Sequence, residues 1–179
     1  NYQETLNVEI ARRTSPTNIG LWLNALLAAH DFGYIPTDEV VGRSLNTLET
    51  LEELQKYRGH LLNWYNVQTL DPLPPRYVST VDSGNLLGSL SVTAQGVRGL
   101  LEQPVLHRRA LDGLRDVVDL MRDAMPGDAP ARELVNELDE LLEEPVTATH
   151  EMVTRLRAVS TLAEHLAAAL LADAARHAP

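Results

Sequence analysis

The sequence predicts an all-α fold: part of an α/α barrel-like helical domain, followed by a helical bundle segment. Apolar residues recur at helical spacing along most of the chain, separated by prolines and glycines. The eight Phe, Trp and Tyr residues all lie at or before Tyr77. Any ligand chemistry that needs flat rings is therefore expected in the first half, and the second half is expected to be structural.

A first helix is predicted to stop around Asp31 to Gly33, where glycine permits a left-handed exit. One face carries Ile19, Trp22, Leu23, Leu26 and Leu27. The residues of its other face are also apolar or small: Leu21, Asn24, Ala25 and Ala28. A helix that is apolar nearly all round is usually buried on both sides.

A second helix is predicted from Thr37 to Gly59, with acidic residues in its first turn. Its outward face carries Glu49, Glu52 and Lys56, and its inward stripe is Val41, Leu45, Leu48, Leu51 and Leu54. An inner helix followed by an outer one is the repeating unit of an α/α barrel.

Residues 60–81 are expected to form an ordered loop or a short irregular strand pair, because the prolines in 71–75 exclude regular structure. A third helix is predicted to begin at Asp82 or Ser83. Its inward residues are Leu86, Leu90, Ala94, Val97 and Leu101. Its four glycines weaken it intrinsically, which is tolerated where a backbone or a ligand comes close (Gly84, Gly88, Gly96 and Gly99).

A soft boundary near Gln103-Pro104 divides the chain into 1–103, a partial barrel segment, and 104–179, a structural bundle segment. Prolines place three further helices, from Pro104 to about Met125, from Asp128 to about Glu144, and from Pro145 onward. The last helix is expected to turn one stripe inward (Val146, Thr149, Val153, Leu156, Ala163 and Leu170). The three helices could form an antiparallel bundle.

Composition excludes several classes of function. A net charge of -10 argues against nucleic-acid binding, and the absence of cysteine excludes disulfides and cysteine-ligated zinc. No apolar run approaches about 20 residues, so no membrane span is expected. The N-terminus lacks a starting methionine and a signal-peptide pattern, so we expect part of a larger protein.

Known catalytic motifs are missing. Neither a phosphate-binding loop nor a nucleophile elbow is present, and His150-Glu151 lacks the second histidine of a zinc helix. Adjacent acidic residues such as Glu143-Glu144 point apart on a helix and make poor catalytic pairs. No catalytic residue, metal site or cofactor is therefore predicted.

Two stretches combine aromatic, hydroxyl, amide and charged side chains: 12–20 (RRTSPTNIG), and 63–66 (NWYN) together with 74–85 (PPRYVSTVDSGN). Sugars bind with their C–H faces on aromatic rings and their hydroxyls paired to such polar groups. Ordinary helix capping and core packing remain the alternative. The candidate substrate-binding residues are Arg13, Thr14, Asn18, Trp64, Tyr65, Arg76, Tyr77, Ser79, Asp82, Ser83 and Asn85.

These stretches, with NYQE at 1–4 and YRGH at 57–60, resemble the glucoamylase-like middle region of bacterial cyclic β-1,2-glucan synthases. The resemblance covers about residues 1–101. Two positions depart from the family pattern: Asn66, where the family usually has Asp, and Leu87-Gly88-Ser89, where Ala-Gly-His is expected.

The resemblance implies a soluble segment of a very large inner-membrane enzyme, on the cytoplasmic side, whose partners are β-1,2-linked glucan and the rest of the polypeptide. The family's middle region is similar to (α/α)6-barrel glycosidases and is expected to cut linear glucan and rejoin it into a ring. Retaining transglycosylation needs two carboxylates about 5 Å apart. Asp82 is the single carboxylate in a matching motif, and its place at a helix start favours an ionised acceptor. The segment is therefore expected to contribute to the glucan-binding wall and to be inactive alone.

A different class of function is a helical interaction module without ligand chemistry. In it, residues 104–179 dock a neighbouring domain or a second copy, and an exposed barrel face drives formation of a homodimer.

Overall fold

The computed structural model describes residues 2–3, 9–125, 131–143 and 145–176. Within these ranges the chain forms six helices and six strands of two residues each, so the all-α prediction is confirmed. The chain divides into two compact units. Unit 1 comprises Asn1–His30 and Ile35–Gln103, and unit 2 comprises Asp31–Tyr34 and Pro104–Pro179.

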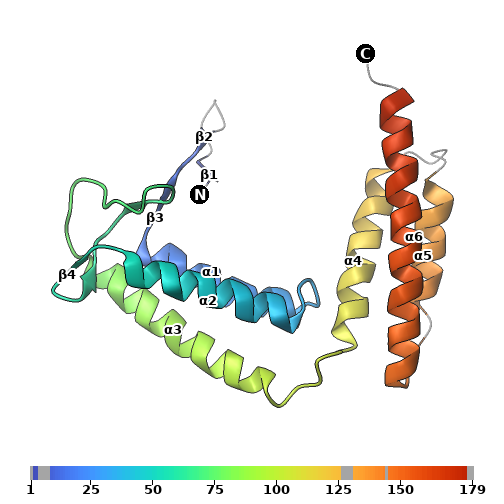
Figure 1. Cartoon of the computed structure of the whole chain (residues 1–179), viewed down its shortest axis with the longest axis horizontal. Helices are drawn as coiled ribbons and strands as arrows, with labels where there is room; N and C mark the ends of the chain where they lie inside the picture. Colours follow the sequence, from blue (N-terminus) through green and yellow to red (C-terminus); the bar gives the residue numbers. More distant parts are fainter. Residues whose placement is uncertain (1, 4–8, 126–130, 144, 177–179) are drawn as a thin grey trace. The chain divides into compact units, whose positions relative to one another are not determined.

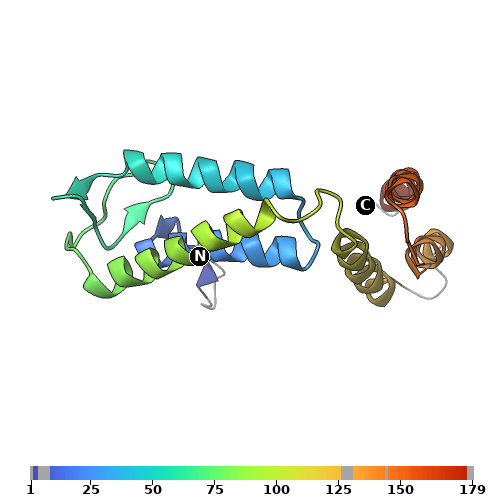
Figure 2. The ribbon, with the colours of Figure 1, turned by 90° about the horizontal axis from the view of Figure 1, so that it is seen from below.

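Three helices of unit 1 lie side by side: α1 (Pro16–Asp31), α2 (Thr37–Glu53) and α3 (Thr80–Leu100) (Figures 1 and 2). α2 returns antiparallel to α1, whereas α1 and α3 run parallel. The parallel direction follows from contacts that pair residues in the same order along both helices: Thr17 with Asp82, Asn24 with Thr93, and Leu27 with Gly96. The barrel arrangement itself stays a prediction.

The strands form three antiparallel ribbons: β1 (Tyr2–Gln3) with β2 (Glu9–Ile10), β3 (Arg13–Thr14) with β6 (Tyr65–Asn66), and β4 (Lys56–Tyr57) with β5 (His60–Leu61). The β3–β6 ribbon opposes Arg13 to Asn66 and Thr14 to Tyr65. It thereby joins the two stretches that carry the predicted site. A compact apolar cluster anchors this end of unit 1, formed by Leu54, Leu61, Leu62, Tyr65 and Leu86.

α2 differs from its prediction in length and in its buried stripe. It ends at Glu53 rather than Gly59, because the chain turns back at Arg58-Gly59 to form the β4–β5 hairpin. The buried residues of α2 are Val40 and Ser44. Three residues of the predicted stripe are exposed instead: Val41, Leu45 and Leu48. The buried stripe of α2 is therefore shifted by one residue toward the N-terminus from the predicted one.

α1 is buried on one side only, so the prediction of burial on both faces is wrong for this chain. Leu23 and Leu26 are buried, as expected. Leu21, Ala25 and Ala28 are exposed, because α2 and α3 cover adjoining sides of α1 and leave this face open. Trp22 is 44% exposed, and its indole Nε1 donates to Thr47 Oγ1 on α2 at 3.1 Å.

α3 begins earlier than predicted, and Ser79 is its N-cap in place of Asp82 or Ser83. Its buried stripe contains Leu86, Ser89 and Thr93, whereas Ala94 and Leu101 of the predicted stripe are exposed. Small polar residues occupy the buried face because α1 approaches closely there.

The four glycines of α3 suggested that another backbone or a ligand comes close to this helix, and the structure shows a close contact with α1 at Gly96. A Cβ on Gly96 would lie 2.4 Å from Leu27 Cδ1 of α1, so any larger residue there would force the end of the Leu27 side chain to move. A Cβ on Gly84, Gly88 or Gly99 would meet nothing within 4 Å.

Unit 2 is built from α4 (Arg109–Ala124), α5 (Arg132–Glu143) and α6 (Thr149–Arg176), which lie side by side with consecutive helices in opposite directions (Figure 1). One core joins them: Leu111, Val118, Ala131, Val135, Leu138, Leu142, Val146, Met152, Val159 and Leu166. The predicted starts at Pro104 and Pro145 are wrong, since both prolines precede their helices by several residues. The predicted start at Asp128 lies outside the described residues.

The buried stripe of α6 differs from its prediction. Thr149, Ala163 and Leu170 are exposed, and Met152, Val159 and Leu166 form the buried stripe in their place. Among the described helices α6 alone is long and apolar enough to cross a membrane, by length and composition only. A single helix of this kind is weak evidence for a membrane span.

Candidate functional site

A cluster of polar side chains lies where the parallel helices α1 and α3 begin, and we call it the N-terminal cluster. It consists of Ser15, Thr17, Ser79, Asp82 and Asn85. Ser15 precedes α1, and its Oγ accepts a hydrogen bond from the backbone N–H of Asn18 at 3.3 Å. Ser79 does the same for α3, accepting from the N–H of Asp82 at 3.2 Å. Both helices therefore start from serine caps at the same end of unit 1.

Thr17 joins the two helix starts. Its Oγ1 donates to Asp82 Oδ1 at 2.6 Å and accepts from Asn85 Nδ2 at 3.1 Å. The short first distance is typical of a hydrogen bond to a charged group. These contacts link residues 65 and 68 positions apart in the chain.

Asp82 is held in its ionised form. Partial burial favours the neutral acid, but hydrogen bonds from the Ser79 hydroxyl, from Thr17 and from the Ser15 hydroxyl outweigh it and lower the pKa of Asp82 below its usual value. The positive ends of two helix dipoles lie beside the same carboxylate and favour its charge further. Asp82 is thus suited to accept hydrogen bonds and unsuited to donate a proton.

Arg13 and Trp64 form a second feature of the site. The guanidinium carbon of Arg13 lies 4.8 Å from the centre of the Trp64 ring, a cation–π geometry that the β3–β6 ribbon brings about. Trp64 is half-buried, and its carbonyl accepts a hydrogen bond from Leu73 N–H at 2.9 Å. Arg13 and the Trp64 ring therefore form a cation–π pair at the surface that the sequence predicted as a platform for a sugar.

Tyr65 is a core residue. It is fully buried, its hydroxyl donates to the carbonyl of Gln55 at 2.7 Å, and the same oxygen accepts from the N–H of Leu62 at 2.7 Å. Burial raises the pKa of Tyr65, and the hydrogen bond from Leu62 offsets part of that rise. Its hydroxyl is fully used by the fold, so its predicted contact with a sugar draws no support from this geometry.

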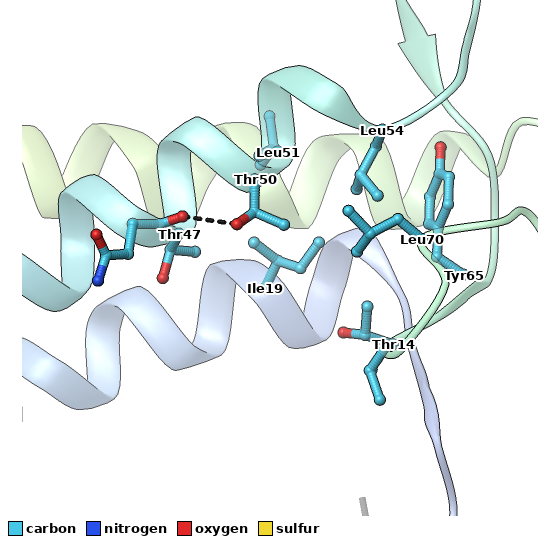
Figure 3. Close-up of a pocket in the computed structure, with 10 residues that line it drawn as sticks. Thr14, Ile19, Thr47, Thr50, Leu51, Leu54, Tyr65 and Leu70 are labelled. Carbon is cyan, nitrogen blue, oxygen red and sulfur yellow. Dashed lines mark hydrogen bonds between the residues drawn. The ribbon is translucent and has the colours of Figure 1, made fainter.

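Thr14 and Tyr65 line an open, largely apolar hollow of about 280 Å³ between α1, α2 and the segment after β6 (Figure 3). Its apolar lining includes Ile19, Leu51, Leu54 and Leu70, and Thr47 and Thr50 of α2 also line it. The lining carries no charged side chain, so this hollow suits apolar surface better than the hydroxyls of a sugar.

The other predicted site residues lie in or just before the first turns of the two helices. Ser83 Oγ donates to the Ser79 carbonyl at 2.8 Å and so serves the helix backbone. Arg76 and Tyr77 are exposed in the extended segment before α3, and the Tyr77 carbonyl accepts from the N–H of Asn63 at 2.9 Å. Asn18 is half-buried in the first turn of α1.

Ser15 and Thr17 are the residues that the candidate set left out, although both lie in the stretch that suggested the site. The spacing Ser15-Pro16-Thr17 marks a helix start, but capping alone does not reveal which helix lies next to it. Thr17 is recognised as the central hydroxyl only once α3 is placed parallel to α1.

The N-terminal cluster offers hydroxyls, an amide and one carboxylate, a set that can bind a polyhydroxylated ligand. Glycoside cleavage with retention or inversion uses two carboxylates, and this cluster contains only Asp82. Across the described parts of the chain, no group of three or more His, Asp or Glu side chains could hold a metal ion.

No protein-family model matches the chain. Over 164 residues, which are 91% of the chain, the sequence is 39% identical to the cyclic beta-(1,2)-glucan synthase NdvB of Rhizobium meliloti (strain 1021). The matched segment makes up 6% of that synthase, so the chain spans a small fraction of its relative's length. The predicted resemblance to cyclic β-1,2-glucan synthases is thereby confirmed at the level of the synthase, while its assignment to the glucoamylase-like region stays a prediction: over nearly its whole length, the chain is similar to one short segment of a cyclic beta-(1,2)-glucan synthase.

Proposed function

We propose that the chain is a segment of a cyclic β-1,2-glucan synthase and supplies part of the wall that binds the glucan. The wall belongs to a glucoamylase-like, (α/α)6-barrel-like domain that cleaves or cyclises β-1,2-glucan by transglycosylation. The segment lies on the cytoplasmic side of the inner membrane, and its partners are the glucan and the remainder of the polypeptide.

The single observation that carries this proposal is the 39% identity to NdvB over nearly the whole chain. The helix order adds support, since α1 and α3 run parallel with the antiparallel α2 between them in sequence. Parallel inner helices that alternate with antiparallel outer ones are what an α/α barrel requires.

The N-terminal cluster supports a role in sugar binding. Neutral hydroxyls and an amide surround a carboxylate that stays ionised, and such a mixture pairs with sugar hydroxyls as donors and acceptors. Asp82 would accept from a glucosyl hydroxyl, and Asn85, which is exposed, would donate or accept beside it.

The isolated segment is expected to be inactive. Transglycosylation with retention needs an acid/base and a nucleophile about 5 Å apart, and the lowered pKa of Asp82 does not suit it to the acid role. Both catalytic carboxylates would come from other parts of the parent enzyme.

The test is calorimetric titration of the chain with linear β-1,2-gluco-oligosaccharides. We expect wild type to bind, and Trp64→Ala and Asp82→Asn to bind about tenfold more weakly, the loss expected for a hydrogen bond to a charged group or a ring contact. Glu49→Ala is the matched control, since it removes an exposed carboxylate from the outer part of α2. Equal binding by all four proteins, or normal cyclisation by a synthase with the two site changes, would contradict the role of the wall.

A second candidate function is a helical interaction module that binds the rest of the polypeptide or a second copy of the chain. Exposed apolar side chains favour it: Leu87 is 67% exposed and Val92 55% exposed on α3, and Leu21 is 57% exposed on α1. Size-exclusion chromatography with light scattering separates the two functions. A monomer at high concentration that binds glucan counts against the module, whereas a dimer indifferent to glucan supports it.

A further inference from the structure

The β4–β5 hairpin projects a strained arginine. Its two-residue turn consists of Arg58, with φ +49°, and Gly59, with φ +84°. Turns of this kind need positive φ at both positions, which Asn, Asp and Gly adopt most easily. Arginine adopts that conformation rarely, because its Cβ crowds the backbone. An asparagine or glycine at this position would form the same turn with less strain.

The two faces of the hairpin differ sharply. On one face Leu61 is buried, and the Nζ of Lys56 donates to the carbonyls of Leu51 (3.0 Å) and Glu52 (2.7 Å) at the end of α2. On the other face Tyr57 and His60 oppose each other in the register and are both exposed, Tyr57 by 57%. Directly opposed residues share a face of an antiparallel ribbon. The hairpin is therefore anchored by one face and open on the other.

The open face groups three kinds of side chain that contact sugars. The guanidinium carbon of Arg58 lies 5.5 Å from the centre of the Tyr57 ring, so the strained residue and the exposed ring form a pair. His60 adds an exposed imidazole opposite the ring. A flat apolar face with hydrogen-bonding groups at its margin is the arrangement that binds a glucosyl residue.

The hairpin also lies near the start of α3. A hollow of about 220 Å³ separates it from the first turns of α3, with Gly59 and His60 on one side and Ser83 and Leu87 on the other. Ser83 is hydrogen-bonded to Ser79, a member of that cluster. A polymer bound at the cluster could therefore continue onto the hairpin without leaving unit 1.

We propose that the β4–β5 hairpin is an additional glucan contact, in which Tyr57 stacks on one glucosyl residue and Arg58 and His60 bind its hydroxyls. This inference rests on the proposed function of the chain, and it extends the wall beyond the N-terminal cluster. It explains why arginine occupies a turn position that disfavours it, as strained backbone often accompanies binding.

Arg58→Gly tests the proposal, because strain and binding predict opposite effects on two measurements. We expect a higher midpoint of urea unfolding, since glycine adopts positive φ freely, and about fivefold weaker binding of linear β-1,2-gluco-oligosaccharides. Tyr57→Ala should weaken binding by about the same factor. Arg98→Ala, which removes an exposed arginine near the other end of α3, is the matched control and should bind as wild type.

The outcomes separate this inference from the proposed function. If wild type binds, Asp82→Asn weakens binding, and both hairpin variants bind as wild type, the hairpin contact is overturned and the wall remains. If wild type binds no glucan, the hairpin contact and the proposed function are both contradicted. If Arg58→Gly stabilises the chain and weakens binding while Arg98→Ala does neither, the proposal is supported.

Discussion

Replacement of Asp82 by Asn would remove the charge that joins the starts of α1 and α3 while keeping the shape of the side chain. The bond that weakens most is the one from Thr17 Oγ1, which spans 2.6 Å. Hydrogen bonds to charged groups contribute about 1.5–3 kcal/mol, and an acidic residue in the first turn of a helix adds about 0.3–1 kcal/mol. Because Asp82 is only partly buried, we expect a value near the lower end, a loss of about 2 kcal/mol in the free energy of unfolding at pH 7.

The effect should depend on pH in a defined direction. The folded pKa of Asp82 is lowered, so its stabilising contribution is complete above the unfolded carboxyl pKa of about 4 and disappears as the pH falls through the lower folded value. The difference between wild type and Asp82→Asn should therefore be constant from pH 5 to 7 and shrink toward pH 2.

Urea unfolding followed by tryptophan fluorescence measures this effect in unit 1, because Trp22 and Trp64 both belong to that unit. A double-mutant cycle with Thr17→Val should give a coupling of about 1 kcal/mol at pH 7 and almost none at pH 2. Glu49→Gln is the control and should change stability little. Additivity of the Thr17 and Asp82 substitutions within about 0.3 kcal/mol at pH 7 would refute the bridge.

Four further substitutions test the packing of unit 1 by the same unfolding assay. Gly20→Ala should lower the free energy of unfolding by about 1–3 kcal/mol, because its Cβ would lie 2.7 Å from Ser89 Cβ. Gly88→Ala is the control: its Cβ would meet nothing within 4 Å, so it should stabilise the protein by up to about 1 kcal/mol. Equal effects of the two substitutions would contradict the close approach of α1 and α3. Tyr65→Phe should cost about 1–3 kcal/mol, since two backbone groups lose their shared partner, and a neutral result would show that water replaces the hydroxyl. Lys56→Met should cost about 0.3–1 kcal/mol, less at high salt, by removing the cation from the end of α2; a cost independent of salt would point to packing instead.

Local signals in the sequence predicted the exit from α1, and its start has the features of a capped helix. Ser15-Pro16 combines a capping hydroxyl with a proline at the first helical position, and Gly33 adopts a φ of +79° just beyond the helix. The existence of all the main helices follows from such signals and from the spacing of apolar residues.

The buried side of each helix was harder to predict, because neighbouring apolar residues compete for it. Val40 and Val41 are adjacent in α2, and only the position of the neighbouring helix decides that Val40 is buried and Val41 exposed. The end of α2 was missed for a similar reason. Leu54 continues the apolar period, yet it belongs to the core beneath the hairpin rather than to the helix.

The sequence predicted which kinds of residue form the candidate site, but not which of them contact one another. Asp82 and Asn85 meet Thr17 because α1 and α3 are parallel neighbours, a relation between distant segments that local spacing does not contain. The same lack of tertiary information made Tyr65 appear available to a ligand, although its ring completes the core.

The hydrogen bonds of Lys56 also affect how the protein can be labelled. It is the single lysine in the sequence, so acylating dyes meet one side-chain amine, and that amine holds the last carbonyls of α2. The adduct would lose its charge and keep a single N–H donor, so the labelled molecule would differ from the native one beside the hairpin. Because the sequence contains no cysteine, a thiol introduced at an exposed position of unit 2 would carry a fluorophore without disturbing that end of the helix.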